Sequence, residues 1–101
     1  MTFDPPLLSA AIVVWTGWGN AQWPVREEAY LIEEFGSEIA AIILPQIRQL
    51  ADSFYASGAR FTIAGLKEMG DVAAGEFRKA HPEISEDAVR ALAWCYTYDY
   101  K

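Results

Sequence analysis

The chain has 101 residues, of which 52% are hydrophobic and 22% charged, and its formal net charge at pH 7 is −6. This length suits one domain and is too short for two independent cores, so we expect residues 1–101 to form a single domain. Fourteen acids against eight bases argue against nucleic acid and against an anionic membrane surface, because both partners need clustered Lys and Arg.

The cysteine content and the N-terminal stretch indicate a cytoplasmic protein. The only cysteine, Cys95, cannot form an internal disulfide, which fits a reducing compartment. The first fifteen residues contain no basic residue and carry Asp4, so we do not expect a signal peptide. The longest apolar runs are also far shorter than the ~20 residues of a membrane-spanning helix.

A first helix is predicted to begin at the Asp-Pro-Pro sequence of residues 4–6. An acceptor at the N-cap precedes prolines, whose missing N–H groups have no partner in a first turn anyway. Apolar residues then recur at helical spacing as far as Trp15, and Gly17 provides the stop. The β-branched run over 12–16 also fits a strand, but we prefer the helix.

After a loop over 19–24, a short second helix is expected from Val25 to Phe35. Pro24 would lie near its first turn, and Gly36 would be the left-handed residue at its C-terminal end. The expected inward side chains are Ala29, Leu31, Ile32 and Phe35.

The stretch from Ser37 to Gly58 predicts a central helix over about 37–57. Two adjacent apolar stripes run along it, as expected of a helix that is contacted from several sides. These stripes contain Ile39, Ile43, Ile47, Leu50 and Phe54, and Ala40, Leu44, Ala51 and Tyr55. Ser37 is the expected N-cap, and Pro45 either kinks the helix or divides it in two.

Two further helices are predicted in the C-terminal half. Thr62 is a plausible N-cap for the first, which ends at His81-Pro82. Its expected apolar stripe is Ile63, Leu66, Met69, Val72 or Ala73, Phe77 and Ala80. Ser85 caps the last helix, with Ile84 positioned to pack on Val89. The aromatic alternation over 94–100 also fits a strand, but we keep the helix because the cap is strong and no strand partner is evident.

The sequence therefore predicts an all-α bundle of five helices, or six if Pro45 breaks the central one. Neither His81 nor Cys95 has the neighbours in sequence that would mark a catalytic group, so we interpret both as structural. The Gly-Trp-Gly-Asn sequence at 17–20 lacks the residues of a phosphate-binding loop and is read as a turn. We predict no catalytic residue, no cofactor and no metal site.

Two features suggest a binding surface. One is an acidic cluster, which consists of Glu27, Glu28, Glu33, Glu34 and Glu38, and which could equally be a solvated face. The other is a surplus of aromatic residues at the two ends of the chain: Trp15, Trp18, Trp23, Trp94, Tyr96, Tyr98 and Tyr100. These rings could instead be shared between packed terminal helices. The acidic cluster together with Trp94, Tyr98 and Tyr100 is our candidate partner-binding set, because aromatic anchors with a charged rim are typical of tight interfaces.

These features favour a small acidic protein that binds another, basic protein, such as a bacterial immunity protein or antitoxin that neutralises a toxin. A homo-oligomeric structural or adaptor module is a second hypothesis, in which the aromatic tail packs against a symmetry mate, for example in a homodimer. The third is a small-molecule-binding domain or an enzyme, with His81 and a carboxylate as acid and base.

Overall fold

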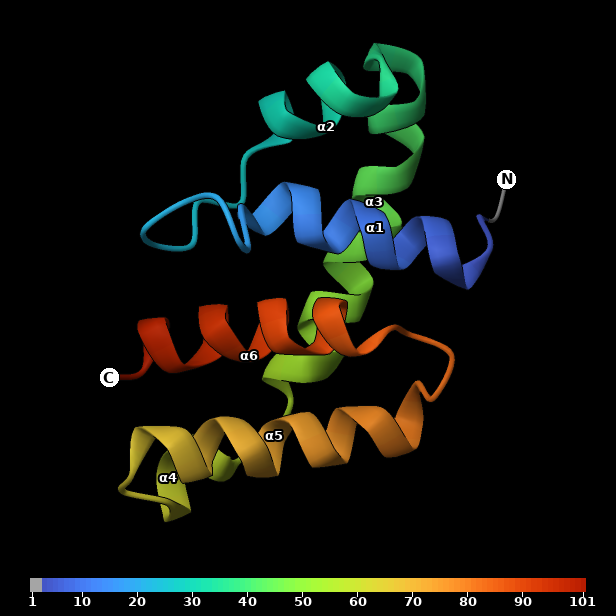
Figure 1. Ribbon diagram of the computed structural model, residues 1–101. Coiled ribbons are helices and arrows are strands. Elements are labelled where there is room, and N and C mark those ends of the chain that lie inside the picture. The colour runs from blue at the N-terminus through green and yellow to red at the C-terminus, as the bar shows by residue number, and fades with distance from the viewer. Residues whose placement is uncertain (1–2) are drawn as a thin grey trace.

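The computed structural model describes residues 3–101. These residues form six helices, and this part of the chain contains no strand (Figure 1). The helices are α1 (Pro5–Thr16), α2 (Glu28–Phe35), α3 (Ser37–Tyr55), α4 (Ala59–Thr62), α5 (Leu66–Ala80) and α6 (Glu86–Asp99). The all-α prediction is confirmed. Both segments that also fitted a strand are helical, because 12–16 lies in α1 and 94–99 lies in α6.

The predicted boundaries of α1 are confirmed, with Asp4 as the N-cap and Gly17 as the C-cap. Asp4 has an extended backbone, and its carbonyl accepts hydrogen bonds from the N–H groups of Leu7 and Leu8. Its side chain makes no capping hydrogen bond. Gly17 has φ of 80°, a left-handed conformation that glycine adopts without steric cost. Its N–H bonds back to the carbonyls of Val13 and Val14, which satisfies the end of the helix.

Helix α2 begins at Glu28, so the prediction of a helix from Val25 was wrong by three residues. The reason is tertiary: Val25 N–H donates to the Thr16 carbonyl (3.2 Å), and Glu27 N–H donates to the Trp15 carbonyl (3.1 Å). Between them, Arg26 has φ of 52°, which breaks any helical continuation. The predicted inward side chains of this helix were also partly wrong. Leu31 is buried and Phe35 half-buried, as predicted, but Ala29 and Ile32 are exposed.

The central helix α3 runs unbroken through Pro45, so the alternative of two separate helices is wrong. Its N-cap is Gly36, at φ of 86°, rather than Ser37, which is already the first helical residue. Helix α3 contacts α1, α2, α5 and α6, which explains why it needs two apolar stripes. Within the two stripes, the fully or nearly fully buried side chains are Ala40, Ile43, Leu44, Ile47 and Phe54.

Thr62 does not cap the next helix, as was predicted, because it is the last residue of the short α4. Helix α5 starts later, at Leu66 after Gly65, and buries Met69, Ala73 and Phe77 as expected, whereas Leu66, Val72 and Ala80 are exposed. Gly70 permits a close approach to α6, because a Cβ at this position would lie 2.9 Å from the Thr97 methyl group.

The cap of α6 is confirmed: the Ser85 hydroxyl accepts a hydrogen bond from the Ala88 N–H (3.3 Å), and Ile84 and Val89 are both buried. His81 is the C-cap of α5, as expected. The N–H of Ser85 also donates to the Ser9 hydroxyl (2.9 Å), which connects the start of α6 to α1.

In space, α1 lies between α2 and α6, and α5 packs on the other side of α6 (Figure 1). Helix α3 crosses this stack and joins its two ends. One hydrophobic core extends through all six helices. No helix in the described part of the chain combines the length and apolar character needed to cross a membrane.

The burial of α3 predicts a large loss of stability for Ile47→Ala. Ile47 is 0% exposed, and deleting a buried branched side chain costs about 2–5 kcal/mol of unfolding free energy. Ile42→Ala, on the same helix but 39% exposed, is the matched control and should cost about 1 kcal/mol or less. Urea unfolding followed by circular dichroism measures both. Equal costs would contradict the position of α3 in the core.

Candidate functional site

The acidic cluster lies on α2 and the residues that flank it. Three of its members are on α2, Glu27 precedes that helix, and Glu38 is in the first turn of α3. All five side chains are exposed. Within residues 3–101, none of these carboxylates forms an ion pair or a hydrogen bond with another side chain. Their charge is therefore available to a partner.

The negative charge is concentrated in the first half of the chain. Residues 1–50 contain six acids and two bases, a net charge of −4 out of the total of −6. Arg26 is already bound to Asp99, and Arg48 forms no ion pair with the five glutamates in the described part of the chain. We call the surface formed by these five glutamates the acidic end.

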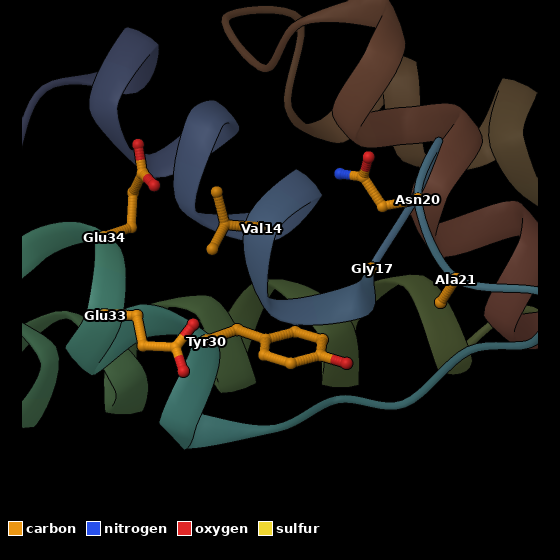
Figure 2. A pocket seen from close by; sticks show the side chains of 7 residues that line it. All are labelled: Val14, Gly17, Asn20, Ala21, Tyr30, Glu33 and Glu34. Carbon is orange, nitrogen blue, oxygen red and sulfur yellow. The ribbon is translucent and has the colours of Figure 1, made fainter.

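A pocket of about 290 Å³ opens beside the acidic end, between the C-terminal turn of α1, the following loop and α2. Figure 2 shows Glu33 and Glu34 at one side of it and Asn20 and Ala21 at the other, with Val14 and Tyr30 between them. The Tyr30 ring lies against the turn at Gly17, where a Cβ would be 3.7 Å from the ring edge.

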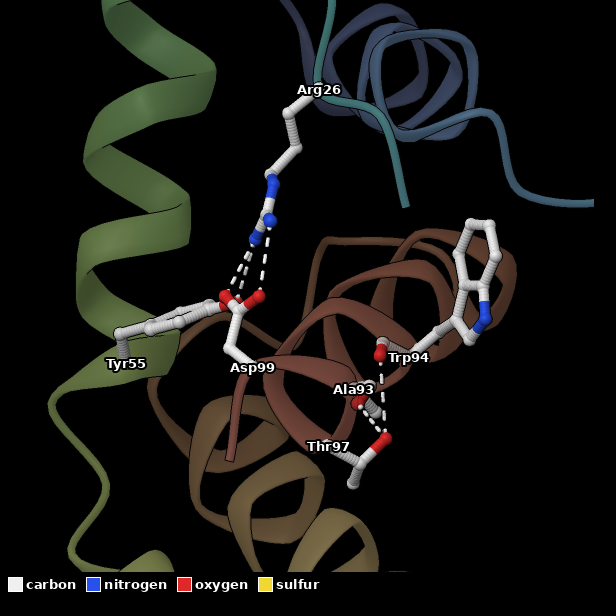
Figure 3. A network of polar contacts seen from close by, with 6 residues as sticks. All are labelled: Arg26, Tyr55, Ala93, Trp94, Thr97 and Asp99. Carbon is white, nitrogen blue, oxygen red and sulfur yellow. Dashed lines mark hydrogen bonds and ion pairs between the residues drawn. The ribbon is translucent and has the colours of Figure 1, made fainter. Parts of the chain in front are cut away.

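The loop before α2 is held by a network that joins Arg26, Tyr55 of α3 and Asp99 of α6 (Figure 3). The Arg26 guanidinium donates two hydrogen bonds to Asp99, from Nη1 to Oδ2 (2.7 Å) and from Nη2 to Oδ1 (3.0 Å). The Tyr55 hydroxyl donates to the same Oδ2 at 2.5 Å and accepts from Arg26 Nη1 at 3.1 Å. Such a two-pronged arginine–carboxylate pair fixes orientation as well as charge.

The pKa values in this network follow from its geometry. Partial burial acts to raise the pKa of Asp99, but the hydrogen bonds from Arg26 and Tyr55 outweigh it and hold the pKa below its ordinary value. The hydrogen bond to Asp99 raises the pKa of Arg26, while burial and the neighbouring carboxylate raise the pKa of Tyr55. All three groups therefore keep the protonation states that the network needs at neutral pH.

The C-terminal aromatic residues are used largely within the fold. Trp94 packs edge-on against Trp18, with ring centroids 5.5 Å apart. Tyr100 lies 5.9 Å from the Tyr55 ring and contacts Tyr96, which is fully buried. Of the three predicted anchors, Trp94 is half-buried, and Tyr98 and Tyr100 are 40% and 39% exposed. Helices α1 and α6 do pack together, as the alternative explanation for these rings required.

Most of the acidic cluster lies on α2 and the aromatic anchors lie on or next to α6, two helices that do not contact each other. The Arg26–Asp99 pair connects the residue before Glu27 to the residue between Tyr98 and Tyr100. Helix α1 lies between α2 and α6 (Figure 1). The candidate set thus divides into the acidic end and an aromatic surface on α6. Sequence reasoning missed Asn20, Tyr30 and the Arg26–Asp99 pair. The isolated base among five glutamates was the one available signal for Arg26.

His81 lies where α5 ends and contacts Ser53 of α3. Its Nε2 is 3.0 Å from the Ser53 hydroxyl, and its ring stacks on Phe77 at 4.8 Å. The other ring nitrogen is 3.9 Å from a Glu83 carboxylate oxygen, which is too far for the hydrogen bond that would orient a catalytic imidazole. These contacts fit a helix-end residue that packs two helices together.

Cys95 is 1% exposed, and burial raises the pKa of its thiol to about 12. A thiol in this state is protonated and unreactive at neutral pH. Residues 3–101 contain no group of three or more His, Cys, Asp or Glu side chains arranged to hold a metal ion.

Comparison of the chain with protein-family models, with curated proteins and with solved structures finds no match in any of the three. Its function must therefore be inferred from the residues and their arrangement alone.

The network predicts that Asp99→Asn destabilises the protein at neutral pH by about 1 kcal/mol, since one partly exposed, two-pronged ion pair is lost. The ionised Asp99 stabilises the folded state above its unfolded-state pKa of about 4, and this contribution disappears as pH falls through the lower folded-state pKa. Thermal melts from pH 7 to pH 2 should show the two proteins converging at acid pH.

Asp71→Asn is the control, because it removes an exposed pair with Lys67 within one helix and should cost no more than about 0.5 kcal/mol. A difference between Asp99→Asn and the unmodified chain that stays constant down to pH 2 would contradict the assigned role of this carboxylate.

Proposed function

We propose that this protein binds a basic protein through the acidic end, as a small inhibitor of the immunity-protein or antitoxin kind does. The observation that supports this most directly is that all five clustered carboxylates lack partners within the described chain. Like-charged neighbours repel one another, so a free acidic surface of this density lowers the stability of the folded protein. A basic surface that covers it removes this repulsion and adds attraction.

The acidic end also offers apolar contact area beside its charges. Tyr30 and Ile32 on α2 are 37% and 43% exposed, and Ile42 of α3 is 39% exposed. A charged rim around aromatic and aliphatic side chains is the composition of interfaces in which a few residues supply most of the affinity. The buried, unreactive Cys95 fits a protein that works in the reducing cytoplasm.

Self-association through the aromatic tail is the weaker proposal. The rings that suggested it are largely engaged inside the fold, since Trp94 packs on Trp18 and Tyr100 on Tyr55. Tyr98 and Tyr100 are nevertheless 40% and 39% exposed, and the Lys101 ammonium lies 4.3 Å from the centre of the Tyr98 ring.

Charge neutralisation with a matched control tests the proposed function. The variant Glu28→Gln/Glu33→Gln/Glu34→Gln removes three charges from the acidic end, and Asp52→Asn/Glu68→Gln/Asp87→Asn removes three exposed acids elsewhere. Each immobilised protein is exposed to lysate of the source organism at low salt, and the retained proteins are identified by mass spectrometry. We expect a basic protein to be retained by the unmodified chain and the control, and lost about tenfold or more with the α2 variant.

If both triple variants lose the retained protein equally, the partner is attracted to net charge alone, and a specific binding surface is contradicted. Retention of the same partner by the α2 variant would place the binding surface elsewhere. Light scattering on the purified protein gives the oligomeric state, and a stable dimer with nothing retained would favour self-association through the aromatic tail.

A further inference from the structure

The pocket beside α2 has the construction of a receptor for one long cationic side chain. Its walls combine the aliphatic Val14 and Ala21 with the ring of Tyr30, and its polar groups are the Asn20 amide and the carboxylates of Glu33 and Glu34 (Figure 2). Among the described residues, the side chains of Asn20, Glu33 and Glu34 and the Tyr30 hydroxyl have no hydrogen-bonding partner. The pocket therefore combines apolar walls with exposed acceptors that no other residue of the described chain occupies.

The volume of the pocket limits what can occupy it. At about 290 Å³ it lies at the lower end of the range for small-molecule sites, which is about 300–1,000 Å³. A cofactor or nucleotide would be too large, and its phosphates would be repelled by Glu33 and Glu34. A single extended side chain fits, with its methylene groups along Val14 and Ala21.

We propose that this pocket accepts an arginine side chain of the basic partner, an inference that rests on the proposed function and adds the chemical group that is recognised. A guanidinium is planar, so it can lie on the Tyr30 ring and donate at the same time to two carboxylates. A lysine ammonium provides charge but neither the plane nor the paired donors. The Asn20 carbonyl and the Tyr30 hydroxyl oxygen are further acceptors within the same pocket.

The loop that forms one wall of the pocket is held in place at both of its ends. Gly17 fixes the turn that carries Asn20 and Ala21, whose N–H groups both donate to the Gly17 carbonyl (2.9 and 2.8 Å). The Arg26 network anchors the other end of this loop to Asp99. A loop wall that is already ordered before binding needs little further ordering when the side chain enters, which favours affinity.

Ligand titration by NMR tests the proposal on the intact protein. N-acetyl-arginine amide is added to ¹⁵N-labelled chain, and N-acetyl-citrulline amide, which has nearly the same shape without the charge, is the matched ligand control. We expect saturable shifts at the amides of Asn20, Ala21 and Tyr30 with the arginine probe. Citrulline should bind at least about fivefold more weakly, because it lacks the charge-assisted contacts to two carboxylates.

Two pairs of substitutions separate a pocket from a general electrostatic attraction. Glu33→Gln/Glu34→Gln neutralises the two acids that line the pocket, and Glu27→Gln/Glu38→Gln neutralises two acids of the same cluster that do not line it. The first pair should weaken arginine binding about fivefold or more, and the second should change it less than about twofold. Ala21→Leu should block the pocket while leaving all charges in place, with circular dichroism as the check on folding.

Equal affinity for citrulline, or equal effects of the two Glu→Gln pairs, would overturn the pocket proposal. The proposed function and this inference also fail separately. If a basic protein is retained equally well by the folded Ala21→Leu variant or by Glu33→Gln/Glu34→Gln, the acidic end binds its partner without the pocket. If the arginine probe binds but no basic protein is retained, the pocket stands and the partner proposal falls.

Discussion

The buried hydroxyl of Tyr96 is the polar constraint on which the packing of the C-terminal half depends. Tyr96 is fully buried, so its hydroxyl must find both a hydrogen-bond acceptor and a donor within the protein. It donates to the Ser57 carbonyl (2.9 Å) and accepts from the Arg60 N–H (3.0 Å), which fixes the turn between α3 and α4 against α6. Its ring contacts Phe54, Tyr55 and Tyr100, so the same residue positions the helices that carry the Arg26 network.

Local signals predicted the elements whose ends are set by neighbouring residues. The Asp-Pro-Pro start and Gly17 stop of α1, the Ser85 cap of α6 and the stripes of α3 could all be read directly. Each depends on backbone conformations or side-chain periods within one or two helical turns. The effect of Pro45 on the helix could not be predicted from the sequence, because the packing of α3 on four other helices decides whether a proline interrupts it.

Long-range contacts account for what the sequence did not reveal. Helix α2 starts late because backbone groups of Val25 and Glu27 pair with the end of α1, and Arg26 takes a left-handed conformation between them. Its partner Asp99 is 73 residues away, a pairing that no local pattern encodes. For the candidate site, the glutamates were identified from sequence, but the pocket was not, because it depends on how the 17–21 turn meets Tyr30. The separation of the acids from the C-terminal rings likewise follows from α1 lying between α2 and α6.

The shallow anchoring of α2 has a consequence for how the molecule fluctuates. Leu31 is the one buried residue of this eight-residue helix, so detaching α2 exposes little apolar surface. We expect the free energy of such local opening to lie well below that of global unfolding, so that amide hydrogens of α2 exchange with solvent sooner than those of α3 or α6. The acidic end is thus carried by a helix with little buried area, and a partner that covers it would slow exchange there without altering the core.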